Sequence, residues 1–164
     1  VAVMTFARTV ATVKEFGPIR ESDTGLKIST SQEDETLLGE AVELALSELD
    51  SRKRTYRAHG VEFYQPWLVV MTDGVPTSAR HRELEGRLKE LTINRKLSVF
   101  VFGIGRADLS ELCSISPGRP PMQINEQKFP ELFAWLSRSV YMVSMSVPGD
   151  GVSLTPLPED VWQV

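Results

Sequence analysis

Residues 68–77, LVVMTDGVPT, carry the strongest structural signal in the sequence. The run from Trp67 to Met71 is apolar and of strand length, which is typical of a parallel strand covered on both faces. An aspartate and a glycine, Asp73 and Gly74, follow within the next few residues. In open α/β sheets, ligands bind beyond the carboxyl ends of the strands, so Asp73 is a candidate ligand. The alternative is that Asp73 and Gly74 only form a strand-to-loop turn.

Strand and helix signals alternate on both sides of this segment. Residues 1–7 and 9–16 are β-rich and predict a hairpin, and a polar stretch predicts a long surface loop before Leu38. An amphipathic helix is expected from Leu38 to near Ser51, and a second from His81 to Leu91. The basic cluster RKRTYR, residues 52–57, is interpreted as a solvated helix end rather than a phosphate-binding patch.

The second half continues the alternation. LSVFVFGIG predicts a buried strand, ADLSELCSI a short helix and MQI a short strand. A last helix is expected to bury an apolar stripe made of Phe129, Leu132, Phe133, Leu136 and Val140. The Pro-rich tail, residues 147–164, is expected to form an extended strap. This order predicts one α/β domain over residues 1–164, with helices on both faces of a mostly parallel sheet. One antiparallel edge strand is also expected.

The composition excludes several classes of function. The 164 residues, 41% apolar and 24% charged, are typical of one globular domain. A net charge of −4 gives no general attraction to nucleic acid. No apolar run is long enough to span a membrane, no signal peptide is recognisable, and Cys113 has no partner for a disulfide. The default expectation is a cytoplasmic location.

Signals of catalysis are weak. The sequence contains no phosphate-binding GxxxxGK loop, no HExxH and no CxxC, and the GIG of residues 103–105 lacks the third glycine of a dinucleotide motif because Asp108 stands there. His59 and His81 are both expected to face solvent. We therefore expect no enzymatic activity, with a metal-dependent phosphohydrolase that uses Asp73 as the alternative.

A second candidate ligand precedes the first clear helix. In DETLLGEAVELAL, Thr36 lies in the loop just before that helix, so its hydroxyl can reach the same sheet edge as Asp73. A hydroxyl and a carboxylate are oxygen ligands suited to a hard cation. The preceding Asp34 and Glu35 either strengthen cation attraction or solvate the loop, and we favour solvation.

Several segments resemble von Willebrand factor A domains, and among them the TerY-type proteins of bacterial tellurite-resistance gene clusters. The residues that carry the resemblance are VAVMTFA, TLLGEAVELAL, PWLVVMTDGVPT, LKELTINRKLSVFVFGIGRADLSELCSISP and FPELFAWLSRSVYMVSMSVPGD. The resemblance implies a Rossmann-like fold and a metal-ion-dependent adhesion site. In such a site Mg²⁺ or another divalent cation is held by a DxSxS motif, a threonine matched by Thr36 and an aspartate matched by Asp73. The residues expected to surround the cation and contact a partner are Asp34, Glu35, Gly74, Pro76, Thr77 and Arg106.

The sequence departs from this family pattern in one respect, because DxSxS occurs nowhere in the 164 residues. The resemblance implies a first strand and helix before residue 1, with that strand central in the sheet between residues 1–7 and 67–71. We expect that such a segment was omitted, cleaved or supplied by another chain, and that the chain alone binds metal weakly or undetectably.

The function implied is a metal-dependent protein-interaction module associated with tellurite or stress resistance. A partner carboxylate would complete the coordination of the cation, and the partners implied are kinase-like or phosphatase-like proteins of the same gene cluster. A scaffold that never binds metal is a further alternative.

Overall fold

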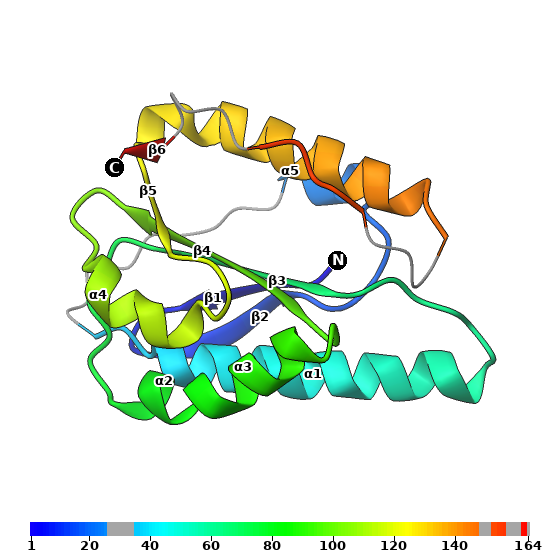
Figure 1. Ribbon diagram of the computed structural model, residues 1–164, viewed down its shortest axis with the longest axis horizontal. Coiled ribbons are helices and arrows are strands. Elements are labelled where there is room, and N and C mark those ends of the chain that lie inside the picture. Colours follow the sequence, from blue (N-terminus) through cyan, green and yellow to red (C-terminus); the bar gives the residue numbers. More distant parts are fainter. Residues whose placement is uncertain (26–34, 148–151, 157–161, 164) are drawn as a thin grey trace.

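The computed structural model describes residues 1–25, 35–147, 152–156 and 162–163. Helix α5 lies on one side of a sheet and α1, α2 and α3 lie on the other (Figure 1). None of the helices in these ranges is long and apolar enough to span a membrane. The elements are β1 (Val3–Phe6), β2 (Val10–Lys14), α1 (Leu38–Ala58), β3 (Trp67–Thr72), α2 (Arg80–Glu83), α3 (Glu85–Ile93), β4 (Ser98–Ile104), α4 (Leu109–Leu112), β5 (Met122–Ile124), α5 (Phe129–Ser144) and β6 (Trp162–Gln163).

Strands β3, β4 and β5 form the parallel part of the sheet, in that order, and β6 pairs antiparallel with β5. The register of β3 on β4 runs from Trp67 opposite Ser98 to Thr72 opposite Gly103. Strand β4 is buried along nearly its whole length because it has a strand on each edge and helices on each face. The parallel α/β arrangement expected around residues 67–71 is therefore present.

The alternation of side chains along β3 divides the core into two clusters. Val70 packs with Leu38 and Val42 of α1 on one face of the sheet. Trp67, Val69 and Met71 pack with Phe100 and with residues of α5 on the other. An uninterrupted apolar run is needed because both faces of β3 meet helices.

The expected single sheet is divided in two. β1 and β2 form an antiparallel hairpin that is hydrogen-bonded to no other strand among the residues described. The hairpin lies against the start of α1, where Leu37 N–H donates to Ala7 O at 3.0 Å, and Phe6 packs on the same cluster as Val70. β1 and β3 thus share a core without a shared hydrogen bond.

The open edge of β3 can be assigned from one hydrogen bond. Ser98 N–H donates to Pro66 O at 2.9 Å, so the backbone groups of alternate residues from Pro66 onward point toward β4. Those of Trp67, Val69 and Met71 point to the opposite edge, where no strand of the described ranges pairs with them. A sheet edge of this kind can accept another strand.

Helix α1 extends to Ala58, well past the end expected near Ser51. Lysine and arginine are good helix formers, so the basic cluster continues the helix until Gly60, whose φ of 64° is typical of a residue just after a helix. Lys53 is therefore a mid-helix residue with an exposed fraction of 9%. The interpretation of the cluster as a solvated helix end is wrong for Lys53.

Helix α5 buries Phe129, Leu132 and Leu136 of the predicted stripe but not its other two residues. Leu132, Trp135 and Ser139 point inward, whereas Phe133 and Val140 are 49% and 53% exposed. Trp135 takes the inward position because its ring meets Phe100 edge-on at 5.7 Å and its Nε1–H donates to Thr155 O at 2.7 Å. The predicted stripe is wrong for these two exposed residues, and the single helix expected over residues 81–91 is interrupted at Leu84, between α2 and α3.

Replacement of Phe100 by alanine should lower the free energy of unfolding by about 3 to 5 kcal/mol, because the ring is 1% exposed and packs on Trp67 and Trp135. Phe133→Ala is the matched control and should lower it by about 1 kcal/mol or less. Urea unfolding followed by circular dichroism measures both. Equal losses for the two variants would contradict the assignment of the buried face of α5.

Candidate functional site

Asp73 lies immediately after β3, at the carboxyl end of the parallel strands. Thr72, which is buried, accepts a hydrogen bond at its Oγ1 from Gly74 N–H at 3.2 Å. This side-chain-to-backbone bond closes a tight turn and leaves the Asp73 side chain exposed. The local sequence Thr-Asp-Gly therefore presents a carboxylate at the rim of the sheet.

The loop that carries Thr36 is bound to the loop that follows β3. Thr36 N–H donates to Thr77 Oγ1 at 3.1 Å, and Thr77 N–H donates to Thr36 O at 3.2 Å. The Thr77 hydroxyl also donates to Thr36 O at 3.3 Å. These bonds hold together two segments that lie 41 residues apart in the sequence.

Thr36 also lies directly against the residue after Asp73. A Cβ atom built on Gly74 would overlap Thr36 Oγ1, so the close approach of the two loops requires a glycine at this position. The structure thus brings the Thr36 hydroxyl and the loop of Asp73 to one rim.

The other residues predicted at this rim differ in their surroundings. Glu35 is exposed and forms an ion pair with Arg8 of the β1–β2 turn at 3.7 Å. Pro76 is half-buried, and Arg106 is exposed in the loop after β4, whose end lies beside that of β3. Asp34 lies outside the described residues. The rim therefore carries charges of both signs around Thr36.

Two features of the rim were not anticipated from the sequence. The first is the role of Thr72 in shaping the turn. The second is the pair formed by Ser78 and Glu40, in which the Ser78 hydroxyl lies 3.2 Å and 3.3 Å from the two Glu40 carboxylate oxygens. Glu40 lies in the first turn of α1, four residues after Thr36, and that spacing is the signal that could have identified it.

The donor types at the rim fit a hard divalent cation, because Thr36 and Asp73 offer hydroxyl and carboxylate oxygens. Mg²⁺ takes about six such ligands. In the part of the chain that the structure describes, no group of three or more His, Cys, Asp or Glu side chains is placed to hold a metal ion. Thr36 and Asp73 alone thus fit such a cation in kind but fill only part of its coordination shell.

Among the described residues, neither histidine is hydrogen-bonded to Thr36 or Asp73. His59 is exposed, as expected, but His81 is only 2% exposed, so the expectation that it faces solvent is wrong. Its Nδ1 lies 2.7 Å from Ser78 O and its Nε2 lies 3.3 Å from Glu111 Oε2. Glu111 also accepts from Arg82 Nη2 at 2.6 Å and 2.7 Å, and the network joins α2 to α4.

A model of the family described as von Willebrand factor type A domain matches residues 1–133 of the chain. The matched range contains both loops that meet at the rim. The comparison with curated proteins gives no match.

Replacement of Gly74 by alanine should lower the free energy of unfolding by about 1 to 3 kcal/mol, because the new methyl group overlaps Thr36 Oγ1. Gly86→Ala on α3 is the matched control, since a Cβ there meets nothing within 4 Å and alanine favours the helix by up to about 1 kcal/mol. Thr36→Ala should recover part of the loss in the Gly74→Ala background. Chemical denaturation measures all three, and a Gly74→Ala variant as stable as Gly86→Ala would contradict the close contact.

The contribution of Glu111 to stability should depend on pH. The hydrogen bonds from Arg82, and more weakly the one from His81, lower the pKa of Glu111 below its ordinary value. The stabilisation is therefore complete above the unfolded-state pKa and is lost as the pH falls through the folded-state pKa. The difference in unfolding free energy between the wild type and Glu111→Gln should be largest near pH 7 and shrink below about pH 4. Urea unfolding between pH 3 and 7 tests this, and the same difference at every pH would refute it.

Proposed function

Because the chain belongs to the von Willebrand factor type A domain family, whose members generally act as protein-interaction modules, we propose that it binds an acidic group of a partner protein through a divalent cation beside Thr36 and Asp73. The contact of Thr36 Oγ1 with Gly74, next to Asp73, is the observation that supports this proposal most directly. In the proposal, Thr36 and Asp73 take the threonine and aspartate positions of the family pattern at one sheet edge.

Each of the two side chains has a defined role in the proposal. Thr36 offers its hydroxyl, while its backbone is held by Thr77. Asp73 offers its carboxylate from a turn closed by Thr72. The cation, with Mg²⁺ the first candidate, would supply the positive charge that attracts a partner carboxylate. Arg106 and the Glu35–Arg8 pair flank the rim and would contribute to the choice of partner.

The remaining protein ligands of the cation come, in this proposal, from a segment that is not part of the 164 residues. The DxSxS motif of the family pattern is absent from them, and β1 and β3 share a core cluster without pairing. A strand inserted between them would satisfy the backbone groups of Trp67, Val69 and Met71 and would end beside Asp73. Without such a segment, metal binding by the chain is expected to be weak or undetectable.

The biological setting proposed is tellurite or stress resistance, with kinase-like or phosphatase-like proteins as partners. It rests on the similarity of residues 88–117 and 129–150 to TerY-type proteins. A binding role is favoured over catalysis because, among the residues described, neither histidine is hydrogen-bonded to a hydroxyl or thiol side chain that could act as a nucleophile.

A synthetic peptide tests the metal site and the strand position together. The peptide has about five Val, Ile or Leu residues followed by Asp-x-Ser-x-Ser, to match the length of β3. Its binding to the chain, measured by fluorescence anisotropy, should strengthen about tenfold or more when Mn²⁺ or Mg²⁺ is added. Asp73→Ala and Thr36→Ala should each remove most of that gain, and the control Glu90→Ala on α3 should keep it.

The two parts of the proposal can fail separately. A peptide that binds equally well with and without the cation, or whose gain survives in Asp73→Ala, would show that the rim holds no metal. A peptide that does not bind under any condition would show that the space beside β3 does not accept this strand.

A further inference from the structure

The end of the sheet opposite Asp73 contains a cavity of ≈ 740 Å³. Its walls include Trp67 and Ser98, the first residues of β3 and β4, together with residues of α1 and the end of α5. Because β3 has six residues at about 3.3 Å each, this cavity lies roughly 20 Å from the rim of Thr36 and Asp73. It is large enough for a small-molecule ligand and does not depend on the proposed function.

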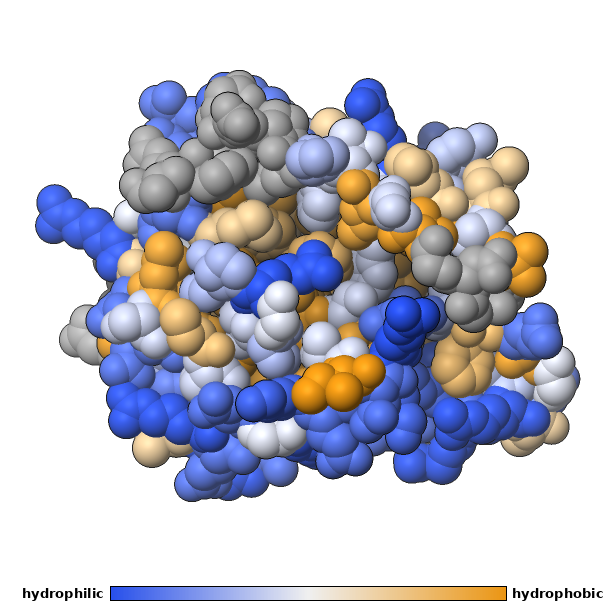
Figure 2. Space-filling model, viewed as in Figure 1, coloured by the Kyte–Doolittle hydropathy of each residue, from blue (hydrophilic) through white to orange (hydrophobic). Residues whose placement is uncertain are grey.

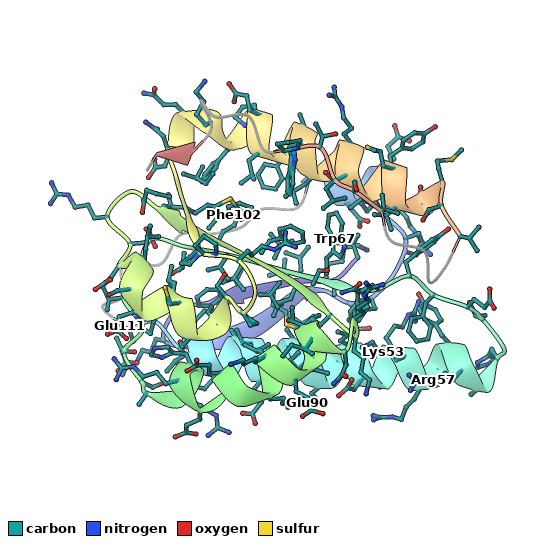
Figure 3. The ribbon with its side chains drawn as sticks, viewed as in Figure 1. Lys53, Arg57, Trp67, Glu90, Phe102 and Glu111 are labelled. Carbon is teal, nitrogen blue, oxygen red and sulfur yellow. The ribbon has the colours of Figure 1, made fainter. Side chains whose placement is uncertain are left out.

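The side chains around the cavity are strongly cationic. Lys53, Arg57, Arg95, Lys96 and Arg119 line it, and among the described residues Asp50 is the one carboxylate that does so. Asp50 already forms an ion pair with Arg87 at 3.3 Å, whereas none of the five cations forms an ion pair within the described part of the chain. Figure 3 shows Lys53, Arg57 and Trp67 on one side of the molecule and Glu111 on the other.

Lys53 is a buried cation in α1. It is 9% exposed, and its ammonium group donates to Lys96 O at 3.0 Å. Burial lowers the pKa of Lys53 because it disfavours the charged form, and the nearby Asp50 opposes this shift. An uncompensated charge in such a position destabilises a fold.

Arg95 lines the cavity and has an unusual backbone conformation. It follows Asn94 at the end of α3 and has a φ of 53°, in the left-handed region where glycine is preferred. Arg95 and Lys96 bring two charges to the cavity at the turn between α3 and β4. Non-glycine residues in this conformation are enriched at binding sites.

The cavity also has apolar walls. Trp67, Phe63 and Leu154 line it together with the cations, and the Trp67 ring packs at a tilt against the buried Phe100, with ring centroids 4.9 Å apart. The face in Figure 2 is hollowed between α5 and α3, and both hydrophobic and hydrophilic residues lie in and around the hollow. A ligand that fits must carry both a multiple negative charge and an apolar part.

We propose that this cavity binds an organic diphosphate or triphosphate, with the phosphate oxygens on Lys53, Arg95 and Arg119 and a flat apolar group against Trp67. Phosphate is favoured over a single carboxylate because several cations converge and the arginine fork matches phosphate oxygens. The bound anion would add to the countercharge that Asp50 provides near Lys53.

Isothermal titration calorimetry with adenosine diphosphate, inorganic pyrophosphate and adenosine as probes tests the proposal. All titrations contain a chelator, so that no cation at the Thr36 rim contributes. Adenosine diphosphate should bind more tightly than pyrophosphate, and adenosine alone should bind weakly. Affinity for the first two should fall with added salt.

Two variants separate binding from folding. Lys53→Met and Arg95→Gly should each weaken binding of adenosine diphosphate about 10- to 100-fold. Both should leave the urea midpoint unchanged or raised, because the first removes a buried charge and the second places glycine at a left-handed position. Lys89→Met, a cation of α3 that does not line the cavity, should bind like the wild type.

Several results would overturn the proposal. Unchanged affinity in both variants would show that these cations do not form the site, and Arg95→Gly decides the matter if Lys53→Met does not fold. A glutamate-rich peptide that binds more tightly than the phosphates would identify an acidic peptide as the ligand instead. No detectable binding of any phosphate at low salt would show that the cavity is not an anion site.

Discussion

The parallel pairing of β3 with β4 is the constraint from which the positions of both candidate sites follow. Its register aligns the ends of the two strands, so the loops after Thr72 and Ile104 emerge at one edge of the sheet and the starts of the strands at the other. Both strands are covered by helices on each face, so the ends are the places where polar side chains reach solvent. One pairing thus separates the rim of Thr36 and Asp73 from the cationic cavity.

The two ends of the sheet differ in the interactions that fix the positions of their side chains. At the rim, backbone and hydroxyl groups of Thr36, Thr77 and Thr72 satisfy one another, and a glycine allows close approach. Neutral, short side chains therefore set the geometry there, and Asp73 remains free to interact. At the cavity, long cationic side chains from separate elements converge on apolar walls. The rim is fixed by hydrogen bonds within the chain, whereas the cavity is lined by cations that form no ion pair among the residues described.

Local patterns in the sequence were enough to predict β3, β4 and the meeting of the Thr36 and Asp73 loops. These predictions depend on short apolar runs and on the rule that parallel strands end together. The burial of His81 and of Lys53 could not be predicted in the same way. The Nε2 of His81 contacts the carboxylate of Glu111, which is 30 residues away in the sequence. The ammonium group of Lys53 donates to the carbonyl of Lys96, which is 43 residues away in the sequence. The inward position of Trp135 on α5 was missed, because it depends on Thr155 and Phe100.

The separation of the hairpin from the main sheet constrains any polypeptide that could join them. Main-chain pairing alone would accept almost any extended sequence. Such a guest segment would lie beside β3 in the same layer, with α1 beneath one face and α5 above the other. Strands with one polar face are common at protein surfaces. In this position such a strand would bury its polar side chains against a helix, which is unfavourable. The hydrophobic pattern of an added strand thus decides whether it fits, since only a strand that is hydrophobic at consecutive positions can pack against helices on both faces.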